Sequence, residues 1–507
     1  MSTQVGVQTY NLFINGEWVP SSSGETFDVI NPANRAVVAK VAKGTKEDVD
    51  KAVDAASAAF ENAEWREMPP NERADVLFKI AQNITKHAQE LVMLEALTSG
   101  GTIRRIGGSD IMLMVDLFQQ MAKFVKEYPF SETLPEPLFP GPAHNFVWRE
   151  PLGVCAAITP WNMPMLIATW KIAPALATGN TIVIKPATNT PVSTLKLAEI
   201  ISEVVPPGVI NVVPGSGGEV GEALVTHPKV EKVGFTGSTE VGRRIMMLAS
   251  STVKNVTLEL GGKSPNIILE DADLDLAIPG SLFGVFLHAG QLCESGTRLF
   301  VPNAIYDEVI ERLAALTKTL KVGHQLDLNT SIGPIISQEQ KETILSYIEA
   351  GKAEGARLVC GGKEAEVKGG ENGFFIEPTI FADVTNDMKI AQEEIFGPVL
   401  SVIRYETVDE AIEMANDTIY GLASGVWTRD VNKAYAVARK IKAGVVWIND
   451  WHMLRNDAPF GGYKQSGIGR EMGKYSLDAY TQLKHVHTSM VPDVKQRRAF
   501  GILFPEG

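Results

Sequence analysis

The chain has 507 residues, a formal net charge of −13 and 45% hydrophobic residues. This length exceeds what one hydrophobic core usually organises, so we expect two or three domains. The negative charge argues against a nucleic-acid partner, and no apolar run approaches the ~20 residues of a membrane span.

Cysteine usage indicates a cellular compartment. The three cysteines, Cys155, Cys293 and Cys360, are scattered and odd in number, which argues against a disulfide framework and for a reducing cytoplasm. Residues 1–6 lack the basic and apolar regions of a signal peptide. We therefore expect a cytoplasmic protein.

The first part of the chain predicts helices after a short strand around residues 12–14. Apolar residues recur at helical spacing over 46–60, 71–98 and 109–126. Five prolines between residues 129 and 142 then break helical structure. We expect this connector to leave the main body of the protein.

From residue 152 to 260 the pattern alternates between strand and helix. Strands are predicted at 153–158, 181–184, 210–213, 232–235 and 256–260, with helices near 164–178, 191–205, 218–227 and 238–250. Short continuous apolar runs are typical of buried parallel strands, so an open, mostly parallel sheet is expected. A second alternating block over about 266–450 predicts a second α/β domain. A strand at 480–487 has no partner nearby in sequence.

Two glycine-rich turns follow predicted strands, where α/β sheets bind their ligands. The run from 215 to 221 is one residue too long for the dinucleotide fingerprint, and the run from 237 to 242 opens a helix. Either could be only a tight turn. Backbone N–H groups and the Ser238 hydroxyl could also hold a pyrophosphate. Lys185 ends a strand, where it could reach a ribose or a phosphate, or simply extend to solvent.

Three residues together suggest covalent chemistry at a carbonyl. Cys293 in Gly-Gln-Leu-Cys offers a nucleophile, Glu259 in Glu-Leu-Gly-Gly-Lys a base, and Asn162 in Pro-Trp-Asn an amide donor. Each alone would mean little, because a lone cysteine is more often a buried hydrophobic residue. No metal-ligand spacing is present, so no metal is expected.

The order of seven motifs resembles the NAD(P)-dependent aldehyde dehydrogenase superfamily. They are Pro-Trp-Asn, Lys-Pro-Ala, Phe-Thr-Gly-Ser-Thr-Glu-Val-Gly, Glu-Leu-Gly-Gly-Lys, Gly-Gln-x-Cys, Glu-Glu-Ile-Phe-Gly-Pro and Pro-Phe-Gly-Gly-Tyr-Lys-x-Ser-Gly. The likeness runs from residue 13 to about 487. It implies two Rossmann-like open α/β domains, one cofactor-binding and one catalytic, plus a small β oligomerisation element.

The domain limits follow from the same resemblance. Residues 1–127 and 148–261 would bind the dinucleotide, and 262–465 would carry the nucleophile. Residues 128–147 and 478–507 would form the oligomerisation element and a C-terminal tail. A homotetramer or homodimer is expected, with a small-molecule aldehyde as partner.

The resemblance also assigns roles to residues. Cys293 would attack the aldehyde, Asn162 would hold the oxyanion, Glu259 would activate water and Lys171 would relay a proton. Residues expected to bind NAD are Ile158, Trp161, Lys185, Thr188, Gly217, Gly221, Phe235, Gly237, Ser238, Val241, Gly242, Gln340, Glu394 and Phe396. Residues expected to line the aldehyde pocket are Met163, Leu166, Ile167, Trp170, Leu287, Leu454 and Phe460. Trp451, His452, Arg455 and Asp457 are expected to add polarity at the entrance.

Two residues depart from the family pattern. Thr188 stands where many NAD-preferring members have glutamate, which removes a repulsion and opens the site to NADP. Glu294 directly follows the nucleophile. Its carboxylate should raise the pKa of Cys293 if it points inward, and only adds polarity at the substrate mouth if it points away.

Several functions stay open at this point. An aliphatic or aromatic aldehyde is the default substrate, and an amino- or trimethylammonium-aldehyde is the alternative, through a cation–π contact with Trp170 or Trp451. An acylating enzyme that uses coenzyme A would commonly lack Glu259, and a silent structural relative would have lost Cys293 or Glu259. A hydrolase would want an oriented histidine, and nothing orients His288.

Overall fold

The computed structural model describes residues 7–137 and 141–504. The first sheet has eight strands in the order β20-β12-β11-β8-β9-β10-β2-β3. Its five central strands run parallel, and β20 and the β2–β3 hairpin are antiparallel edges. In sheet order the strands are β20 (Gly467–Ile468), β12 (Asn255–Glu259), β11 (Val230–Thr236), β8 (Val154–Ile158), β9 (Thr181–Lys185), β10 (Ile210–Val212), β2 (Leu12–Ile14) and β3 (Glu17–Val19).

The central strands of this sheet are buried on both faces. Along β8, Cys155 and Ala157 belong to one apolar core, whereas Val154, Ala156 and Ile158 belong to another. This alternation follows from the two-residue period of a strand and explains the continuous apolar runs of the sequence. One face is covered by α3 (Pro70–Lys86), α4 (Ala88–Ser99), α6 (Ile111–Glu127), α7 (Pro164–Ala177) and α8 (Pro191–Ser202), and the other by α1 (Lys46–Glu61), α9 (Glu222–Thr226) and α10 (Thr239–Ala249).

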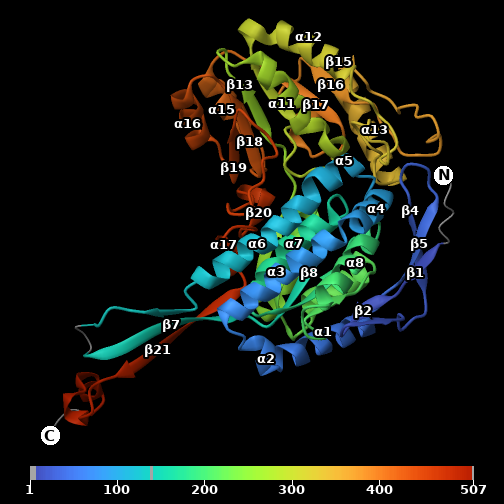
Figure 1. Cartoon of the computed structure of the whole chain (residues 1–507). Helices are drawn as coiled ribbons and strands as arrows, with labels where there is room; N and C mark the ends of the chain where they lie inside the picture. The colour runs from blue at the N-terminus through green and yellow to red at the C-terminus, as the bar shows by residue number, and fades with distance from the viewer. Residues whose placement is uncertain (1–6, 138–140, 505–507) are drawn as a thin grey trace.

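A second α/β body stands above the first in Figure 1. Its seven-stranded sheet has the order β15-β16-β17-β14-β13-β18-β19 and is parallel except for β15. The strands are β15 (Arg357–Cys360), β16 (Thr379–Ala382), β17 (Val399–Tyr405), β14 (Arg298–Pro302), β13 (Pro265–Ile268), β18 (Ala423–Trp427) and β19 (Val445–Ile448). The helices are α11 (Leu274–Phe286), α12 (Tyr306–Thr317), α13 (Gln338–Ala353), α14 (Lys389–Gln392), α15 (Val408–Asn416) and α16 (Val431–Lys440). The expected pair of Rossmann-like α/β folds is confirmed.

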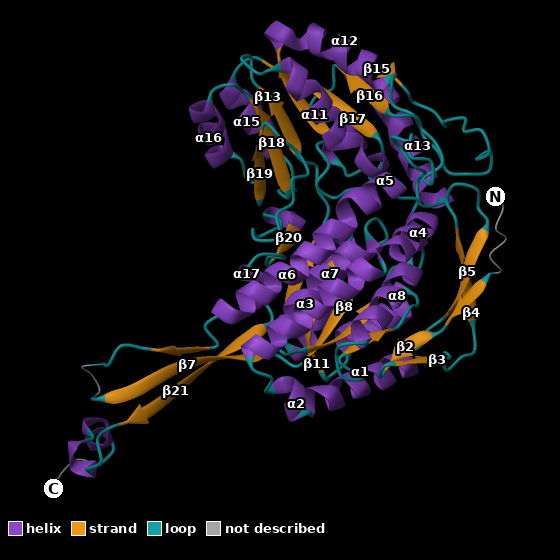
Figure 2. Cartoon of the chain, viewed as in Figure 1, coloured by secondary structure: helices purple, strands orange, loops and turns teal. Residues whose placement is uncertain are grey.

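The proline-rich connector joins a β ribbon that projects away from both bodies (Figure 2). It contains β6 (Ser131–Thr133), β7 (Ala143–Pro151) and β21 (Thr481–Ser489). β21 pairs antiparallel with all of β7, which supplies the partner that the strand predicted at 480–487 lacked locally. Residues 138–140 of the connector lie outside the described residues.

The sequence analysis was incomplete at the N-terminal end. Besides β2 and β3, this region contains a separate sheet of β1 (Gln8–Tyr10), β5 (Val37–Ala42) and β4 (Thr26–Ile30). β1 and β4 are short and mostly exposed, so they lack the apolar run that marks a buried strand. β5 is half buried, and Lys40 interrupts its apolar run. The helix predicted over 71–98 is two helices, because the chain leaves helical geometry at His87 (φ −97°, ψ 9°). The remaining short helices are α2 (Ala63–Arg66), α5 (Ile103–Arg105) and α17 (Tyr475–Asp478).

None of the helices in residues 7–137 and 141–504 combines the length and apolar character needed to cross a bilayer. Across the same ranges, no three His, Cys, Asp or Glu side chains gather as a metal site.

Candidate active site

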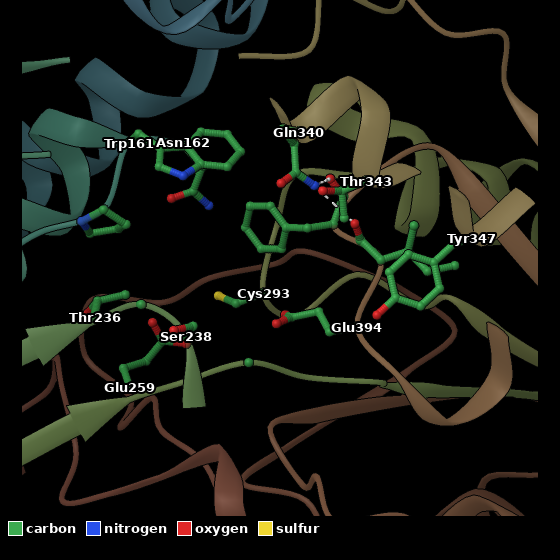
Figure 3. Close-up of a pocket in the computed structure, with 15 residues that line it drawn as sticks. Trp161, Asn162, Thr236, Ser238, Glu259, Cys293, Gln340, Thr343, Tyr347 and Glu394 are labelled. Carbon is green, nitrogen blue, oxygen red and sulfur yellow. Dashed lines mark hydrogen bonds between the residues drawn. The ribbon is translucent and has the colours of Figure 1, made fainter. Parts of the chain in front are cut away.

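A cavity of about 270 Å³ lies between the two α/β bodies and contains the predicted nucleophile (Figure 3). The parallel strands β11 and β12 end at this cavity, which is where such a sheet binds ligands. It is lined by Pro160, Trp161, Asn162, Thr236, Gly237, Ser238, Glu259, Gly261, Cys293, Gln340, Thr343, Tyr347, Glu394, Ile395 and Phe396.

Cys293 lies on a sharp loop that follows α11. His288 and Ala289 have φ angles of 52° and 55°, in the left-handed region that non-glycine residues rarely adopt. The Gln291 side chain fixes this loop, since its amide donates to the carbonyl oxygens of His288 and Pro334 at 3.0 and 3.3 Å. The nucleophile is thus held by a buried amide two residues away.

Asn162 is directed at the same loop. Its Nδ2 donates to the carbonyl oxygen of Gln291 at 2.8 Å, and its side chain is buried. Figure 3 shows Asn162, Cys293 and Glu259 around one cavity. The amide therefore lies where it could donate to an oxyanion formed beside Cys293.

Glu259 is the last residue of β12 and is 1% exposed. Neither carboxylate oxygen has a hydrogen-bond partner among the described residues. Burial raises the pKa of Glu259 to about 8, against smaller opposing effects of the Cys293 thiol and then of the Lys171 charge. A carboxyl group in this state changes charge close to neutral pH, as a general base for water requires.

Glu294 points inward, which resolves the alternative left by the sequence. The Cys293 thiol donates to Oε2 of Glu294 at 3.3 Å, and Oε1 lies 2.9 Å from Nδ1 of His452. Burial, followed by the charges of Glu259 and Glu294, raises the pKa of Cys293 well above its ordinary value. Burial would also raise the pKa of Glu294, but the hydrogen bond and charge of His452 hold that pKa below its usual value.

Lys171 is fully buried on α7 behind the cavity. Its ammonium donates to the Thr236 hydroxyl at 2.7 Å and to Glu471 at 3.0 Å. Thr236 itself lines the cavity. The contacts connect Lys171 to the cavity wall through one hydroxyl.

The second body contributes Glu394 and Phe396 to the wall opposite the first sheet. Oε1 of Glu394 accepts a hydrogen bond from the backbone N–H of Gly262 at 3.0 Å, and burial raises the pKa of Glu394 to about 7. A Cβ at Gly261 would collide with this carboxylate, and one at Gly262 would collide with the Cys293 carbonyl oxygen. The two glycines of Glu-Leu-Gly-Gly-Lys are therefore needed for close approach.

The predicted cofactor residues fall into two groups. Trp161, Gly237, Ser238, Gln340, Glu394 and Phe396 line the cavity beside Cys293. The Trp161 and Phe396 rings meet edge to face at 5.2 Å, and Gln340 donates to the carbonyl oxygens of Ile395 and Phe396 at 3.0 and 3.1 Å (Figure 3). The other predicted residues do not line this cavity and lie in or near the strand ends and turns of the first sheet: Ile158, Lys185, Thr188, Gly217, Gly221, Phe235, Val241 and Gly242.

Several contacts position members of the second group at the strand ends and turns of the first sheet. The Lys185 ammonium donates to the Pro186 carbonyl oxygen at 2.9 Å, and burial lowers its pKa to about 8. Gly221 packs beside the Lys185 side chain, and the Thr188 hydroxyl donates to the Gly215 carbonyl oxygen at 3.2 Å. Ser238 caps the N-terminus of α10 by accepting from the Val241 N–H at 3.3 Å.

The predicted aldehyde-pocket residues pack with Cys293 in one apolar cluster. The Trp170 and Phe460 rings pack at a tilt of 55°, with their centroids 5.4 Å apart. Met163, Leu166, Ile167, Trp170 and Phe460 are buried, and Leu287 and Leu454 are partly buried against the same cluster. None of these lines the cavity between the two bodies.

Trp451 was wrongly expected at the entrance. It is fully buried, and its ring packs where Gly284, Gly296 and Gly425 have no side chain. An indole enclosed in this way cannot contact a substrate cation. Arg455 and Asp457 do form an exposed ion pair at 2.8 Å.

The sequence analysis missed cavity residues contributed by α13. Thr343 and Tyr347 line the cavity together with Gln340, three and seven positions earlier on the same helix. That spacing places all three on one helix face and could have identified them. The contact between His452 and Glu294 joins residues 158 positions apart and left no local signal.

Comparison with known proteins gives consistent matches over almost the whole chain. The model of the aldehyde dehydrogenase family matches residues 18–486. DhaS, a Bacillus subtilis protein assigned as an aldehyde dehydrogenase, is 48% identical over 483 residues, covering 95% of this chain and 96% of the relative. Betaine aldehyde dehydrogenase of Bacillus subtilis is 45% identical over 482 residues, covering 95% and 98%.

Solved structures agree with the sequence relatives. The NAD+ complex of an aldehyde dehydrogenase from Bacillus cereus superposes with a TM-score of 0.92 at 45% identity, covering 95% of this chain and 97% of that one. Betaine aldehyde dehydrogenase from Staphylococcus aureus in complex with NAD+ gives a TM-score of 0.93 at 43% identity, covering 96% and 95%.

Proposed function

The chain belongs to the aldehyde dehydrogenase family, and we propose that it oxidises an aldehyde to a carboxylic acid with NAD through a covalent intermediate on Cys293. The observation that carries this proposal is the grouping of Cys293, Asn162 and Glu259 around one cavity between the two bodies. These three groups come from separate segments and supply a nucleophile, an oxyanion donor and a base.

The residues around the cavity fit a dinucleotide cofactor. The N-terminus of α10 and the buried Lys185 ammonium suit a pyrophosphate and a ribose, and Glu394 with Gln340 would hold the nicotinamide half. NAD supplies an acceptor for the hydride that leaves the substrate carbon. Because Thr188 carries no charge, we propose that NADP is also accepted.

Each remaining step of the reaction is assigned to a residue of the site. The sulfur of Cys293 bonds to the aldehyde carbon, and the resulting oxyanion accepts from the Asn162 amide and the Cys293 N–H. After hydride loss the carbon is held as a thioester. Glu259, once ionised, takes a proton from water, which attacks the thioester and releases the acid. Lys171 would relay that proton through Thr236.

The aldehyde is proposed to be aliphatic or aromatic, because the cluster beside Cys293 is apolar. An amino- or trimethylammonium-aldehyde is the second candidate. The betaine aldehyde dehydrogenases among the relatives favour it. The presence of Glu259 argues against transfer to coenzyme A, and the intact Cys293 and Glu259 argue against a silent structural protein.

The test follows reduced nicotinamide formation with a panel of aldehydes, NAD or NADP, and no coenzyme A. Cys293→Ala should abolish turnover, a loss of at least about a thousandfold, because the nucleophile is removed. Cys360→Ala is the matched control and should leave turnover unchanged, since that thiol lies outside the cavity. Turnover that survives Cys293→Ala would contradict the proposal.

We also propose a cytoplasmic homotetramer or homodimer bridged by the β6–β7–β21 ribbon. The three unpaired cysteines suit a reducing compartment. Leu483 on the ribbon and Ile502 and Leu503 in the tail are 69%, 89% and 75% exposed, which favours a covering subunit. Sedimentation of the full chain and of a chain ending at His487 would measure the contribution of the tail.

A further inference from the structure

Two buried carboxylates act on the Cys293 thiol, and Glu294 is the one that lies within hydrogen-bond distance of it. The thiol donates to Glu294 at 3.3 Å, whereas Glu259 makes no hydrogen bond with any described residue. Glu294 and His452 side chains are 6% and 4% exposed, so this contact is shielded from solvent. A buried carboxylate next to a nucleophile is costly unless hydrogen bonds hold it in place.

We propose that Glu294, oriented by His452, accepts the Cys293 proton as the sulfur attacks the aldehyde, while Glu259 serves the later attack by water. The inference rests on the proposed role of Cys293 as nucleophile. It assigns separate bases to the two half-reactions of the cycle. Glu294 thereby becomes a catalytic residue, and His452 a positioning residue that acts through it.

The charge states of the two carboxylates agree with this division. The pKa of Glu259 lies at about 8, so at neutral pH much of this group carries a proton and cannot take another. His452 keeps the pKa of Glu294 below its usual value, so this group is ionised at the same pH. An ionised carboxylate only accepts hydrogen bonds, so Nδ1 of His452 is the donor to Oε1, and Oε2 is left for the thiol.

The steps balance without any further reactant. In the attack, the S–H bond breaks and its proton goes to Oε2 of Glu294, while the sulfur electron pair forms the bond to the aldehyde carbon. In hydrolysis, the C–S bond breaks and the sulfur leaves with that electron pair. The proton on Glu294 then returns to the sulfur. The carboxylate and the thiol are regenerated for the next cycle.

Packing fixes His452 in the required position. Its ring meets Phe283 of α11 edge to face at 5.4 Å and lies beside Trp447 and Trp451. Trp451, the preceding residue, is locked against Gly296, three positions after the nucleophile. The histidine loop and the nucleophile loop therefore pack directly together.

The test measures thiol reactivity without aldehyde or cofactor. Iodoacetamide alkylates the protein across a pH series, and peptide mapping by mass spectrometry assigns the modified cysteine. In the wild type, alkylation of Cys293 should vary little between about pH 6 and about pH 7.5, because Glu294 stays ionised. A wild-type rate that rises about tenfold per pH unit over this range would overturn the proposal, whatever the variants do.

Matched neutral variants separate the two carboxylates. Glu294→Gln should slow alkylation about tenfold or more near pH 7, and the residual rate should rise toward pH 8 as Glu259 ionises. Glu259→Gln should keep the flat profile. A carboxylate that only repels the thiolate would give the opposite sign, with Glu294→Gln faster than wild type. An unchanged or faster rate in Glu294→Gln overturns the proposal.

His452→Ala tests the positioning role through the shape of the pH profile. Without its partner the buried Glu294 should have a higher pKa, so alkylation should begin to fall at a higher pH than in the wild type. His452→Gln, which can still donate, should restore part of the profile. A merely structural effect would lower the rate equally at every pH and would overturn the role of His452.

The groups facing the thiol that could add to these profiles are few among the described residues. Glu259 at the end of β12 and Glu294 act on the thiol directly. Lys171 on α7 and Glu471 act on Glu259, and His452 acts on Glu294. Lys171 and Glu471 are paired with each other at 3.0 Å.

Failure of this inference can be told from failure of the proposed function. If Cys293→Ala retains turnover, or alkylation maps to Cys155 or Cys360, both are overturned. If Cys293 is essential and is the alkylated residue, but Glu294→Gln leaves its pH profile unchanged, only the role of Glu294 is overturned.

Discussion

Glu259 and Glu294 are both buried beside Cys293, but their surroundings shift their pKa values in opposite directions. In the wall built from the first sheet, Glu259 is buried with no hydrogen-bond geometry to another described residue, and its pKa rises to about 8. The loop wall buries Glu294 almost as deeply, yet bonds it to Cys293 and His452, and its pKa falls below the usual value. The partner, and not the burial, decides which carboxylate is ionised at neutral pH.

The largest expected effect that tests this contrast comes from Glu259→Gln. The rate at which the carboxylic acid product is released should fall by about 10²- to 10⁴-fold. The attacking water then has no base, whereas the thiol still has Glu294. Rapid mixing should still show one burst of reduced nicotinamide per active site, followed by slow turnover. If both the burst and the steady-state turnover are lost, Glu259 also acts as the base for the Cys293 thiol.

The pH dependence of wild-type turnover belongs to the same comparison. If Glu259 is the base for water, the steady-state rate should rise with pH through about 8. This rise should disappear in Glu259→Gln. Glu294→Gln should retain it.

A smaller effect is expected on stability, with opposite signs for the two residues. The folded-state pKa of Glu259 is raised, so its contribution to stability is present below its unfolded pKa near 4.5 and is lost as pH rises through about 8. Glu259→Gln should therefore gain unfolding free energy relative to wild type between pH 5 and pH 9, on the order of 3 kcal/mol.

Glu294 should behave in the reverse direction, because its folded-state pKa is lowered. Its contribution is present above the usual glutamate pKa and is lost as pH falls through the lowered value. Glu294→Gln should thus approach wild-type stability only in acid. Urea unfolding of both variants at several pH values measures this difference, and parallel curves for the two variants would contradict it.

The smallest expected effect is a change in cofactor preference on substitution of Thr188. Thr188→Glu should lower kcat/KM with NADP about tenfold or more, since a carboxylate would repel the 2′-phosphate. The value with NAD should change by less than about threefold. Thr188→Gln, of equal length and without charge, is the control. Equal losses with both cofactors would place the residue away from the ribose.

The sequence predicted the site residues of the first sheet better than those of the loops that carry Glu294 and His452. Glu259, Ser238 and Gly237 stand at the ends of apolar strand runs, so strand prediction and the motifs together located them. The contact of Glu294 with His452 depends on a sharp turn at His288 and Ala289 and on the burial of Trp451. Such tertiary contacts carry no periodicity that a single sequence reveals. The mostly exposed strands β1 and β4 were missed for the same lack of pattern, and the short, half-buried β5 was missed with them.

The burial of Trp451 affects whether the Glu294–His452 contact could be introduced into a related protein by substitution. Its indole fills space that Gly284, Gly296 and Gly425 leave empty, and a Cβ at any of them would strike the ring. Substituting glutamate and histidine alone into a homologous chain would therefore not recreate their 2.9 Å contact. The contact depends on Trp451 together with Gly284, Gly296 and Gly425. We therefore expect substitutions at these four positions to be correlated among related proteins.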